Sequence, residues 1–253
     1  MSFPDVPMRR LGLTAAAAIA IVAFTGTAAA QSMVVRSTGP SAAKYPTGTK
    51  LKSTDRLTLV AGDKVVLMQA GKTRTLSGPG TFGATGSIQA SQSMGATVTR
   101  MLSTGPTMRS RGGFSRGPTP EVADLRAPTL WLLDYREGGT FCVANPSTLM
   151  LWRPDMTSDQ LLKIEEGDKE ETVAIVAGAN FRKWPTEALP VQYGVDYRLS
   201  GAGLSKPVVV RFAPMETLPD SAEGSVNMLM AKGCTSQLNR LVDAMSENEA
   251  TGG

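Results

Sequence analysis

The chain contains no histidine, and this absence excludes much of the common chemistry of enzymes. Without an imidazole there is no Ser-His-Asp or Cys-His nucleophile, no histidine general base and no zinc site built on two or three histidines. Aromatic residues are also few, at 6% of the 253 residues, against 42% hydrophobic and 19% charged residues. This is the composition of an ordinary globular chain, with length for one large domain or two small ones. We therefore expect no catalytic residues, no cofactor and no metal site.

One catalytic pattern needs no histidine. Ser41 and Lys44 match the S-x-x-K spacing of serine/lysine hydrolases. In that chemistry both residues lie on the first turn of a helix, whereas here they fall in a turn between Gly39-Pro40 and Tyr45-Pro46. No S-D-N or K-T-G companion follows, so a hydrolase is the least favoured of three functional hypotheses.

The first thirty residues have the pattern of an export signal. A basic pair, Arg9-Arg10, precedes an apolar run from Leu11 to Phe24 and a small-residue end, Ala28-Ala29-Ala30. We expect residues 1–30 to be a signal peptide cleaved after Ala30; a retained anchor and a twin-arginine signal are the alternatives. No later segment approaches the roughly 18 unbroken apolar residues of a membrane span, so the mature chain is expected to be periplasmic or secreted.

Export also predicts the fate of the two cysteines, Cys142 and Cys234. In an oxidising compartment such a pair usually forms a disulfide. Closing a loop of more than ninety residues stabilises a fold by about 4–5 kcal/mol in the chain-entropy model. A redox or metal role would need a C-x-x-C spacing or further ligands, which are absent, so we expect a structural disulfide.

Charge is divided unevenly along the chain. Residues 31–120 contain twelve Lys and Arg against only two acidic residues, whereas residues 121–253 contain twelve against nineteen. Either the basic part faces an anionic envelope surface or another periplasmic or membrane protein, or the two halves attract one another. Export argues against a nucleic-acid partner.

The same basic part holds a run that resembles an arginine-glycine segment. Arg109, Arg111 and Arg116 alternate with Gly and Ser and are candidate binding residues. They lie within residues 84–128, a stretch rich in Ser, Thr, Gly and Pro that we expect to be a flexible linker. Val98, Met101 and Leu102 share one face at helical spacing, which allows a short helix there.

Two β units are predicted on either side of this linker. Residues 31–83 show short apolar alternation broken by turns, typical of a basic module of four or five strands. Leu57 and Leu59, then Val65 and Leu67, keep period two around Ala61-Gly62-Asp63, which predicts a hairpin. So small a module is expected to depend on a neighbour for stability.

Residues 129–215 predict an acidic, immunoglobulin-like sandwich of two antiparallel sheets. Its expected strands are Thr129–Tyr135, Thr140–Val143, Leu149–Trp152, Gln160–Glu165, Thr172–Ala177, Asp196–Leu199 and Val208–Phe212. The acidic run from Glu165 to Glu171 is read as a solvated hairpin tip rather than a calcium site.

Residues 216–247 predict a pair of helices, Ser221 to Lys232 and Thr235 to Met245, separated by Gly233 as a C-cap. The second carries Leu238, Leu241, Val242 and Met245 on one stripe, expected to pack on the open face or edge of the sandwich. Residues 248–253 are expected to be a disordered tail. The expected fold class is therefore mainly β with two short C-terminal helices.

The N-terminal module resembles the periplasmic FecR-type module over about fifty residues. The resemblance rests on Val34-Val35-Arg36-Ser37-Thr38-Gly39-Pro40, Leu57-Thr58-Leu59 with Ala61-Gly62-Asp63, and Arg74-Thr75-Leu76 with Gly78-Pro79-Gly80-Thr81-Phe82. The whole chain is also similar to exported bacterial proteins of unassigned activity. The FecR-type resemblance implies a sensing or scaffolding role at the envelope. FecR regulators carry a cytoplasmic segment before their membrane span, whereas here only seven residues precede Met8.

The tryptophans supply the remaining candidates. Trp131, Trp152 and Trp184 fall in or beside strands, where core packing is the default. Trp152 and Arg153 leave an aromatic ring and a cation at a strand end, which makes them candidate binding residues, or an internal stacked pair. We thus expect a non-enzymatic envelope protein acting as a binding, scaffold or sensor component; the alternative is a polysaccharide- or ligand-binding module with surface tryptophans.

Overall fold

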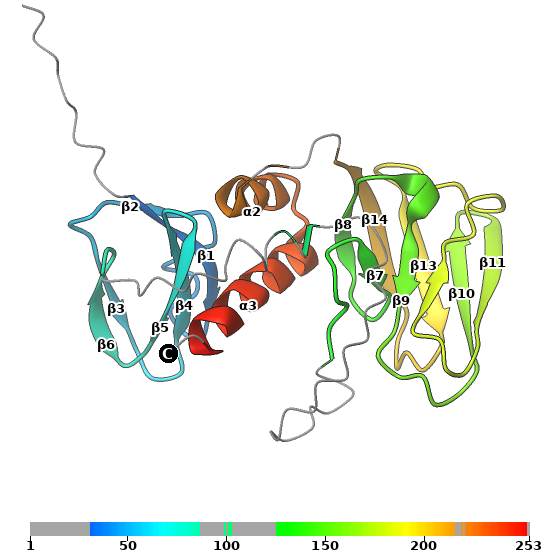
Figure 1. Ribbon diagram of the computed structural model, residues 1–253, viewed down its shortest axis with the longest axis horizontal. Helices are drawn as coiled ribbons and strands as arrows, with labels where there is room; N and C mark the ends of the chain where they lie inside the picture. Colours follow the sequence, from blue (N-terminus) through cyan, green and yellow to red (C-terminus); the bar gives the residue numbers. More distant parts are fainter. Residues whose placement is uncertain are drawn as a thin grey trace, which may run out of the picture.

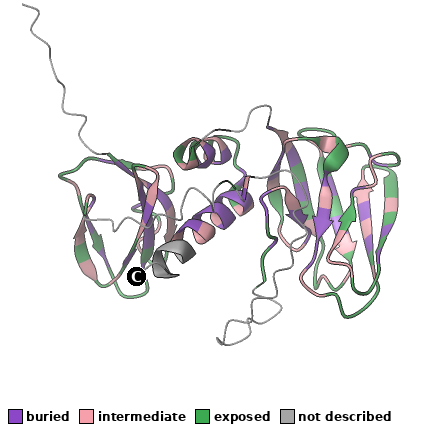
Figure 2. Ribbon diagram, in the orientation of Figure 1, coloured by how far each residue is buried: buried purple, intermediate pink, exposed green. Residues whose placement is uncertain are grey.

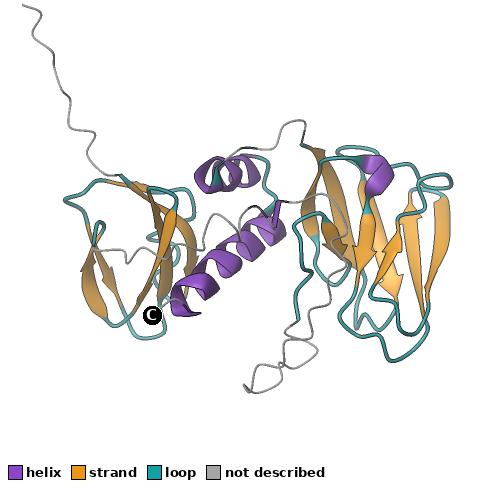
Figure 3. Cartoon of the chain, viewed as in Figure 1, coloured by secondary structure: helices purple, strands orange, loops and turns teal. Residues whose placement is uncertain are grey.

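The described part of the computed structural model consists mainly of two β units, with two C-terminal helices placed between them (Figures 1 and 3). The structure describes residues 31–86, 99, 101–102, 125–215, 219 and 221–251. The mainly β fold and the two C-terminal helices are confirmed. In the described part of the chain no helix is long and apolar enough to cross a membrane.

The N-terminal module contains six strands: β1 (Ser32–Thr38), β2 (Lys50–Leu51), β3 (Arg56–Leu59), β4 (Lys64–Gln69), β5 (Lys72–Ser77) and β6 (Gly80–Gly83). Four of them form an antiparallel sheet in the order β2-β1-β4-β5, and β3 pairs with β6 in a second, two-stranded sheet. The module is therefore a small two-layer unit.

The hairpin predicted at residues 61–63 is wrong. Strands β3 and β4 do not pair, although Leu57, Leu59, Val65 and Leu67 do share one core. The turn instead carries the chain from one sheet to the other, because the Asp63 carboxylate accepts hydrogen bonds from the N–H groups of Val60 (2.6 Å) and Ser41 (2.8 Å). The tight hairpin joins β4 to β5, through residues 70–71, both with positive φ.

Strand β4 is buried on both faces, which explains its unbroken apolar run. Val65 and Leu67 face the core of the module. Val66 and Met68 face outward into a second core made largely by the two helices. The module was expected to depend on a neighbour for stability. The structure shows the neighbour, because the C-terminal helices cover one face of the larger sheet of the module.

The sandwich has eight strands: β7 (Leu132–Asp134), β8 (Gly139–Val143), β9 (Met150–Trp152), β10 (Gln160–Glu166), β11 (Lys169–Ile175), β12 (Phe181–Lys183), β13 (Asp196–Gly201) and β14 (Val208–Pro214). A 3₁₀ turn, η2 (Pro146–Thr148), joins β8 to β9. All seven predicted strands are present, and only β12 was not expected. Strands β10 and β11 form the predicted acidic hairpin.

The sheets of the sandwich are mixed rather than wholly antiparallel, which corrects the immunoglobulin-like prediction. The sheets have the orders β11-β10-β13-β14-β8 and β12-β9-β7. Strand β8 pairs with β14 in parallel, and β7 pairs with β9 in parallel. A parallel pair requires the chain to cross back to the starting end of the first strand before the second strand begins. The alternation of apolar residues does not show in which direction a strand runs.

Helix α2 (Ala222–Ala231) and helix α3 (Thr235–Thr251) follow β14. Gly233, at φ 70°, ends α2 as predicted: its N–H bonds the carbonyl of Met230 (3.0 Å) and the N–H of Cys234 bonds that of Leu229 (2.9 Å). Helix α3 continues four residues into the segment expected to be a disordered tail, since no Gly or Pro interrupts it before Gly252.

Helix α3 is buried on more than one side because it lies between the two β units (Figure 2). It contacts β8 of the sandwich as well as β1 and β5 of the module. The predicted stripe of Leu238, Leu241, Val242 and Met245 is buried in the shared core. The prediction placed α3 on the sandwich alone, and the structure shows that it joins both units.

Two features attach α3 to the edge strand β8. The predicted disulfide between Cys142 and Cys234 is present, with the two Cα atoms 5.8 Å apart. The buried amide of Gln237 accepts from the N–H of Cys142 (2.7 Å) and donates to the carbonyls of Cys142 (3.0 Å) and Leu130 (2.9 Å). The side chain therefore pairs with main-chain groups that a further strand would otherwise satisfy.

Part of the expected linker is also packed. Residues 99 and 101–102 are helical, in line with the short helix allowed by the sequence. Met101 is buried in the shared core, and its carbonyl accepts from the N–H of Leu130 (3.1 Å). Around Met101, the expected linker is therefore packed against the rest of the protein.

Candidate functional site

Arg153 lies inside the protein rather than on its surface, where a binding residue was predicted. The residue is 1% exposed, and its guanidinium donates to the carbonyls of Ala179 (2.9 Å), Ser158 (2.8 Å) and Val176 (2.7 Å). A cation with this many acceptors holds neighbouring loops together. Its role is structural.

Trp152 is likewise buried, at 4% exposure, so it cannot serve as a surface anchor. The cation beside its ring is Arg136, 5.6 Å from the ring centroid, and not Arg153. Hydrogen bonding to Asp134 raises the pKa of Arg136 and offsets the cost of its partial burial. The predicted internal stacking is therefore present with a different arginine.

The other two tryptophans do not form a sugar-binding platform. Trp184 is buried at the centre of an aromatic cluster, with ring centroids 5.2 Å from Tyr197 and 5.1 Å from Phe212. Trp131 is half-buried, and its indole N–H donates to the carbonyl of Leu102 (2.9 Å). A platform would need at least two exposed rings on one face, so the surface-tryptophan hypothesis loses its basis.

The three arginines of the glycine-rich run, Arg109, Arg111 and Arg116, lie outside the described residues. Their predicted binding role stays a prediction.

The Ser41 and Lys44 pair is not assembled as a nucleophile and its base. No hydrogen bond joins the Ser41 hydroxyl to the Lys44 amine; Lys44 instead lies 5.3 Å from the centroid of the Tyr45 ring. Burial raises the pKa of Asp63, but its hydrogen bonds with Ser41 and the N–H of Val60 outweigh this and lower it overall. Ser41 thus belongs to the turn that Asp63 organises.

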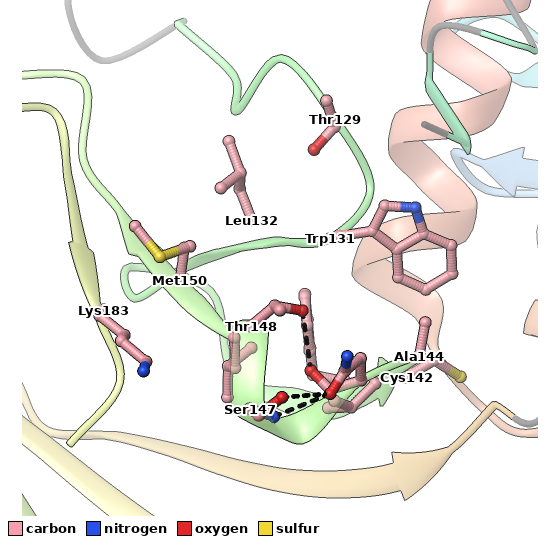
Figure 4. Close-up of a pocket in the computed structure, with 13 residues that line it drawn as sticks. Thr129, Trp131, Leu132, Cys142, Ala144, Ser147, Thr148, Met150 and Lys183 are labelled. Carbon is pink, nitrogen blue, oxygen red and sulfur yellow. Dashed lines mark hydrogen bonds between the residues drawn. The ribbon is translucent and has the colours of Figure 1, made fainter. Parts of the chain in front are cut away.

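An apolar cleft of about 340 Å³ opens where the edge strands β7 and β8 approach each other (Figure 4). Trp131, Leu132, Phe141 and Met150 supply its apolar walls, and Lys183 of β12 lies on the opposite side from Trp131. The size is at the small end of the range for ligand pockets.

The polar groups of the cleft gather at η2 and β12. The Asn145 side chain accepts from the N–H (3.0 Å) and hydroxyl (2.7 Å) of Ser147, which fixes the turn. Lys183 is exposed and makes no ion pair with a described residue. Chemically, the cleft can accept an apolar group with a polar or anionic end near Lys183.

The second candidate site is the outer surface of the N-terminal module. Its exposed cations are Lys44, Lys50, Lys52, Arg56 and Lys64. None of these five makes an ion pair within the described chain. We call them the basic surface.

In the part of the chain that the structure describes, no group of three or more Cys, Asp or Glu residues is placed to hold a metal ion. Neither a protein family, a curated protein nor a solved structure matches the chain. Function must therefore be inferred from the geometry.

Sequence reasoning missed the cleft, because its walls come from two sheet edges whose meeting depends on parallel pairing. The only sequence signal was the adjacent pair Trp131-Leu132, two large apolar side chains beside a predicted strand. In the fold both are partly exposed at the cleft.

Proposed function

We propose that this protein is an exported, non-enzymatic component of the bacterial envelope that binds or scaffolds an anionic surface or partner protein through its N-terminal module. The observation that supports the proposal most is the basic surface, five exposed cations without ion pairs among the described residues. Uncompensated charge of one sign attracts partners of the other sign over distances near the Debye length, about 8–10 Å. A FecR-type module would suit such a sensing or scaffolding role.

Attraction between the two halves of the chain is a poor alternative explanation of the charge asymmetry. Among the described residues a single ion pair, Arg36 with Asp243, joins the module to the rest of the protein. The remaining ion pairs lie within residues 126–211. The exposed lysines of the module are thus left for an outside partner.

Salt-dependent binding to vesicles tests this proposal. Wild-type protein should bind phosphatidylglycerol vesicles and lose binding steeply as salt rises. A triple variant, Lys50→Gln, Lys52→Gln and Arg56→Gln, should bind roughly 100-fold more weakly, at about 1 kcal/mol for each charge near the membrane. The matched control is Lys169→Gln, Arg182→Gln and Lys206→Gln, three exposed cations of the sandwich that make no ion pair with a described residue. Equal binding by the two triple variants would contradict the proposal.

Export is supported by the disulfide and by the signal pattern of residues 1–30, which lie outside the described residues. We propose a periplasmic or secreted location with cleavage after Ala30. The measured mass of the mature protein should be that of a chain that begins at Gln31. Its two cysteines should resist alkylation until they are reduced. An intact N-terminus would contradict cleavage.

The apolar cleft supports a second candidate function, binding of a small ligand with an apolar body and an anionic end. Decanoate is a suitable probe, since its chain would lie along Leu132 and Met150 while its carboxylate approached Lys183. Decanoate should change the fluorescence of Trp131, and Lys183→Gln should weaken that change several-fold. Lys206→Gln is the control, because Lys206 is exposed and is not among the residues that line the cleft.

A further inference from the structure

A cavity of about 430 Å³ lies where the module, the sandwich and helix α3 meet. Arg36 of β1 lines it from the module, and Arg126, Glu137 and Gly138 line it from segments beside the sandwich. The first turns of α3 complete it with Thr235, Ser236, Asn239, Arg240 and Asp243. Apart from Gly138, every residue that lines it has a polar or charged side chain, unlike the residues of the apolar cleft.

Both carboxylates of the cavity are already occupied. Glu137 pairs with Arg126 (2.7 Å) and also accepts from the hydroxyl of Ser236. Asp243 pairs with Arg36, whose Nε donates to the side-chain oxygen of Asn239 at 3.1 Å. Each of these acids is thus already paired with a cation other than Arg240.

Among the described residues, Arg240 is the cation of this cavity that makes no ion pair. It is 8% exposed, and its Nε and Nη1 atoms are buried without a hydrogen-bond partner in the described part of the chain. Burial lowers its pKa, opposed by the charges of Glu137, Asp134 and Asp243 and reinforced by that of Arg126. Arginine stays charged under any ordinary condition. The cavity thus holds three guanidinium groups against two carboxylates.

Other polar groups surround the same space. Asn239 contributes its side-chain amide, and the hydroxyls of Thr235 and Ser236, which donate to the carbonyl of Gly233 (3.4 Å) and to Glu137, also line it. Thr235 is the first residue of α3, and its own N–H bonds the carbonyl of Gly233 (2.9 Å), so the positive end of the helix dipole lies at this end of the cavity. Donors that approach from different elements suit an anion with acceptors on every side.

We propose that this cavity binds a phosphate-type tetrahedral oxyanion, free or as the phosphate of a lipid headgroup, with Arg240 as its buried counter-ion. Carboxylates are planar and offer fewer acceptors, so they fit the spread of donors less well. Such an anion would contact groups from the module, the sandwich side and α3 together. Binding here does not require the basic surface and is independent of the function proposed above.

Phosphate titration at constant ionic strength tests the proposal. Inorganic phosphate should raise the unfolding temperature of the wild-type protein by about 3–6 °C at a tenfold excess over the dissociation constant. Chloride at the same ionic strength should give no such rise. Arg240→Met should abolish the phosphate response, whereas Arg198→Met, an exposed arginine of the sandwich, should retain it.

Stability without phosphate separates a binding role of Arg240 from a structural one. Because a methionine removes a buried charge that has no partner, Arg240→Met should unfold at the same temperature as the wild type or higher. A large fall would indicate that the fold needs this charge and would count against the proposal. Arg126→Met, whose side chain is half exposed, is the second variant and should weaken phosphate binding severalfold.

The source of the phosphate is distinguished by a vesicle arm. Phosphatidylcholine vesicles with and without phosphatidic acid are compared for wild type, Arg240→Met and the triple variant of the basic surface. Phosphatidic-acid binding that needs Arg240 but survives loss of the basic surface assigns the site to a headgroup; a response to inorganic phosphate alone assigns it to a free anion. No response in either arm, an equal response by Arg240→Met, or an equal effect of acetate would overturn the proposal.

Discussion

The N-terminal module and the sandwich are both built from short strands, but they differ in how they bury apolar surface and in how they balance charge. The module core has nine buried residues, against sixteen in the sandwich, whose aromatic cluster has no counterpart in the module. The larger sheet of the module therefore needs α3 on its outer face. The sandwich is closed by its own two sheets.

The module and the sandwich also differ in how far their charged side chains are paired. On the sandwich, Lys163 bridges Glu165 (3.0 Å) and Glu170 (2.8 Å), and Arg211 meets Asp196 (2.7 Å). Surface pairs of this kind contribute little to stability, but they leave little net charge exposed. The module leaves its lysines unpaired among the described residues. The unit that depends on its neighbour for packing is thus also the one that presents charge to a partner.

Loss of the disulfide should reduce stability more than any other change proposed here. The double variant Cys142→Ser, Cys234→Ser should lower the free energy of unfolding by about 4–5 kcal/mol, because the unfolded chain regains a long open loop. Chemical denaturation of the wild type and the double variant measures the difference. Hydrogen exchange should quicken most in the module and in α3. Equal stability of the two proteins would show that the cross-link adds nothing to the other contacts of α3.

Met68→Ala should separate the two units. Met68 is 2% exposed and lies between the outer face of the module and the helices, so its loss should cost about 2–3 kcal/mol. Hydrogen exchange should quicken in β1 and β4 while the sandwich stays protected. Leu162→Ala, in the core of the sandwich, is the matched control and should give the reverse pattern. The same exchange pattern in both variants would mean that the two units unfold as one.

Gln237→Ala should have an intermediate effect. It leaves the N–H and C=O of Cys142 and the C=O of Leu130 unpaired in the interior, at a cost of about 1–3 kcal/mol. Gln237→Glu sharpens the test, since it keeps the acceptor for Cys142 N–H and loses the donor to both carbonyls. Both variants should lower the midpoint of denaturation. An unchanged midpoint would show that α3 is held to β8 by the disulfide and apolar contacts alone.

Substitution of Asp63 should give the smallest loss of stability, and the size of that loss should depend on pH. Its pKa in the folded protein lies below the ordinary value of 3.8, so its contribution to stability is present above pH 3.8 and is lost as pH falls through the lowered pKa. The stability difference between wild type and Asp63→Asn should therefore shrink on acidification. Denaturation of both proteins between neutral pH and pH 2 measures it. A difference that is constant with pH would contradict the assignment.

Local features of this fold could be predicted from the sequence with good success. The strand positions of the sandwich follow from alternation and turn residues, and Gly233 separates the two helices as its position indicates. The disulfide follows from having two cysteines in a chain whose sequence predicts export. Each of these features depends on residues close in sequence or on a simple count.

Long-range features could not be predicted. The sequence around Asp63 has the pattern of a hairpin turn. In the fold, the Asp63 carboxylate accepts a hydrogen bond from the N–H of Ser41, which lies twenty-two residues earlier in the chain. The parallel pairings of β7 and β8 depend on where the chain returns. Arg153 was expected as a candidate surface residue, and only the assembled fold shows its guanidinium with three carbonyl acceptors. Nothing in the sequence marks Arg240, two of whose nitrogens are buried without a partner among the described residues.

The placement of α3 also sets an order for folding. The strands of the module come first along the chain, and the helix that covers Val35, Val66 and Met68 comes last. On the export route proposed above, the module would cross the membrane with that apolar face open until the helices had followed. That interval would then be the one in which the protein is most exposed to aggregation, and an envelope chaperone would act on this face.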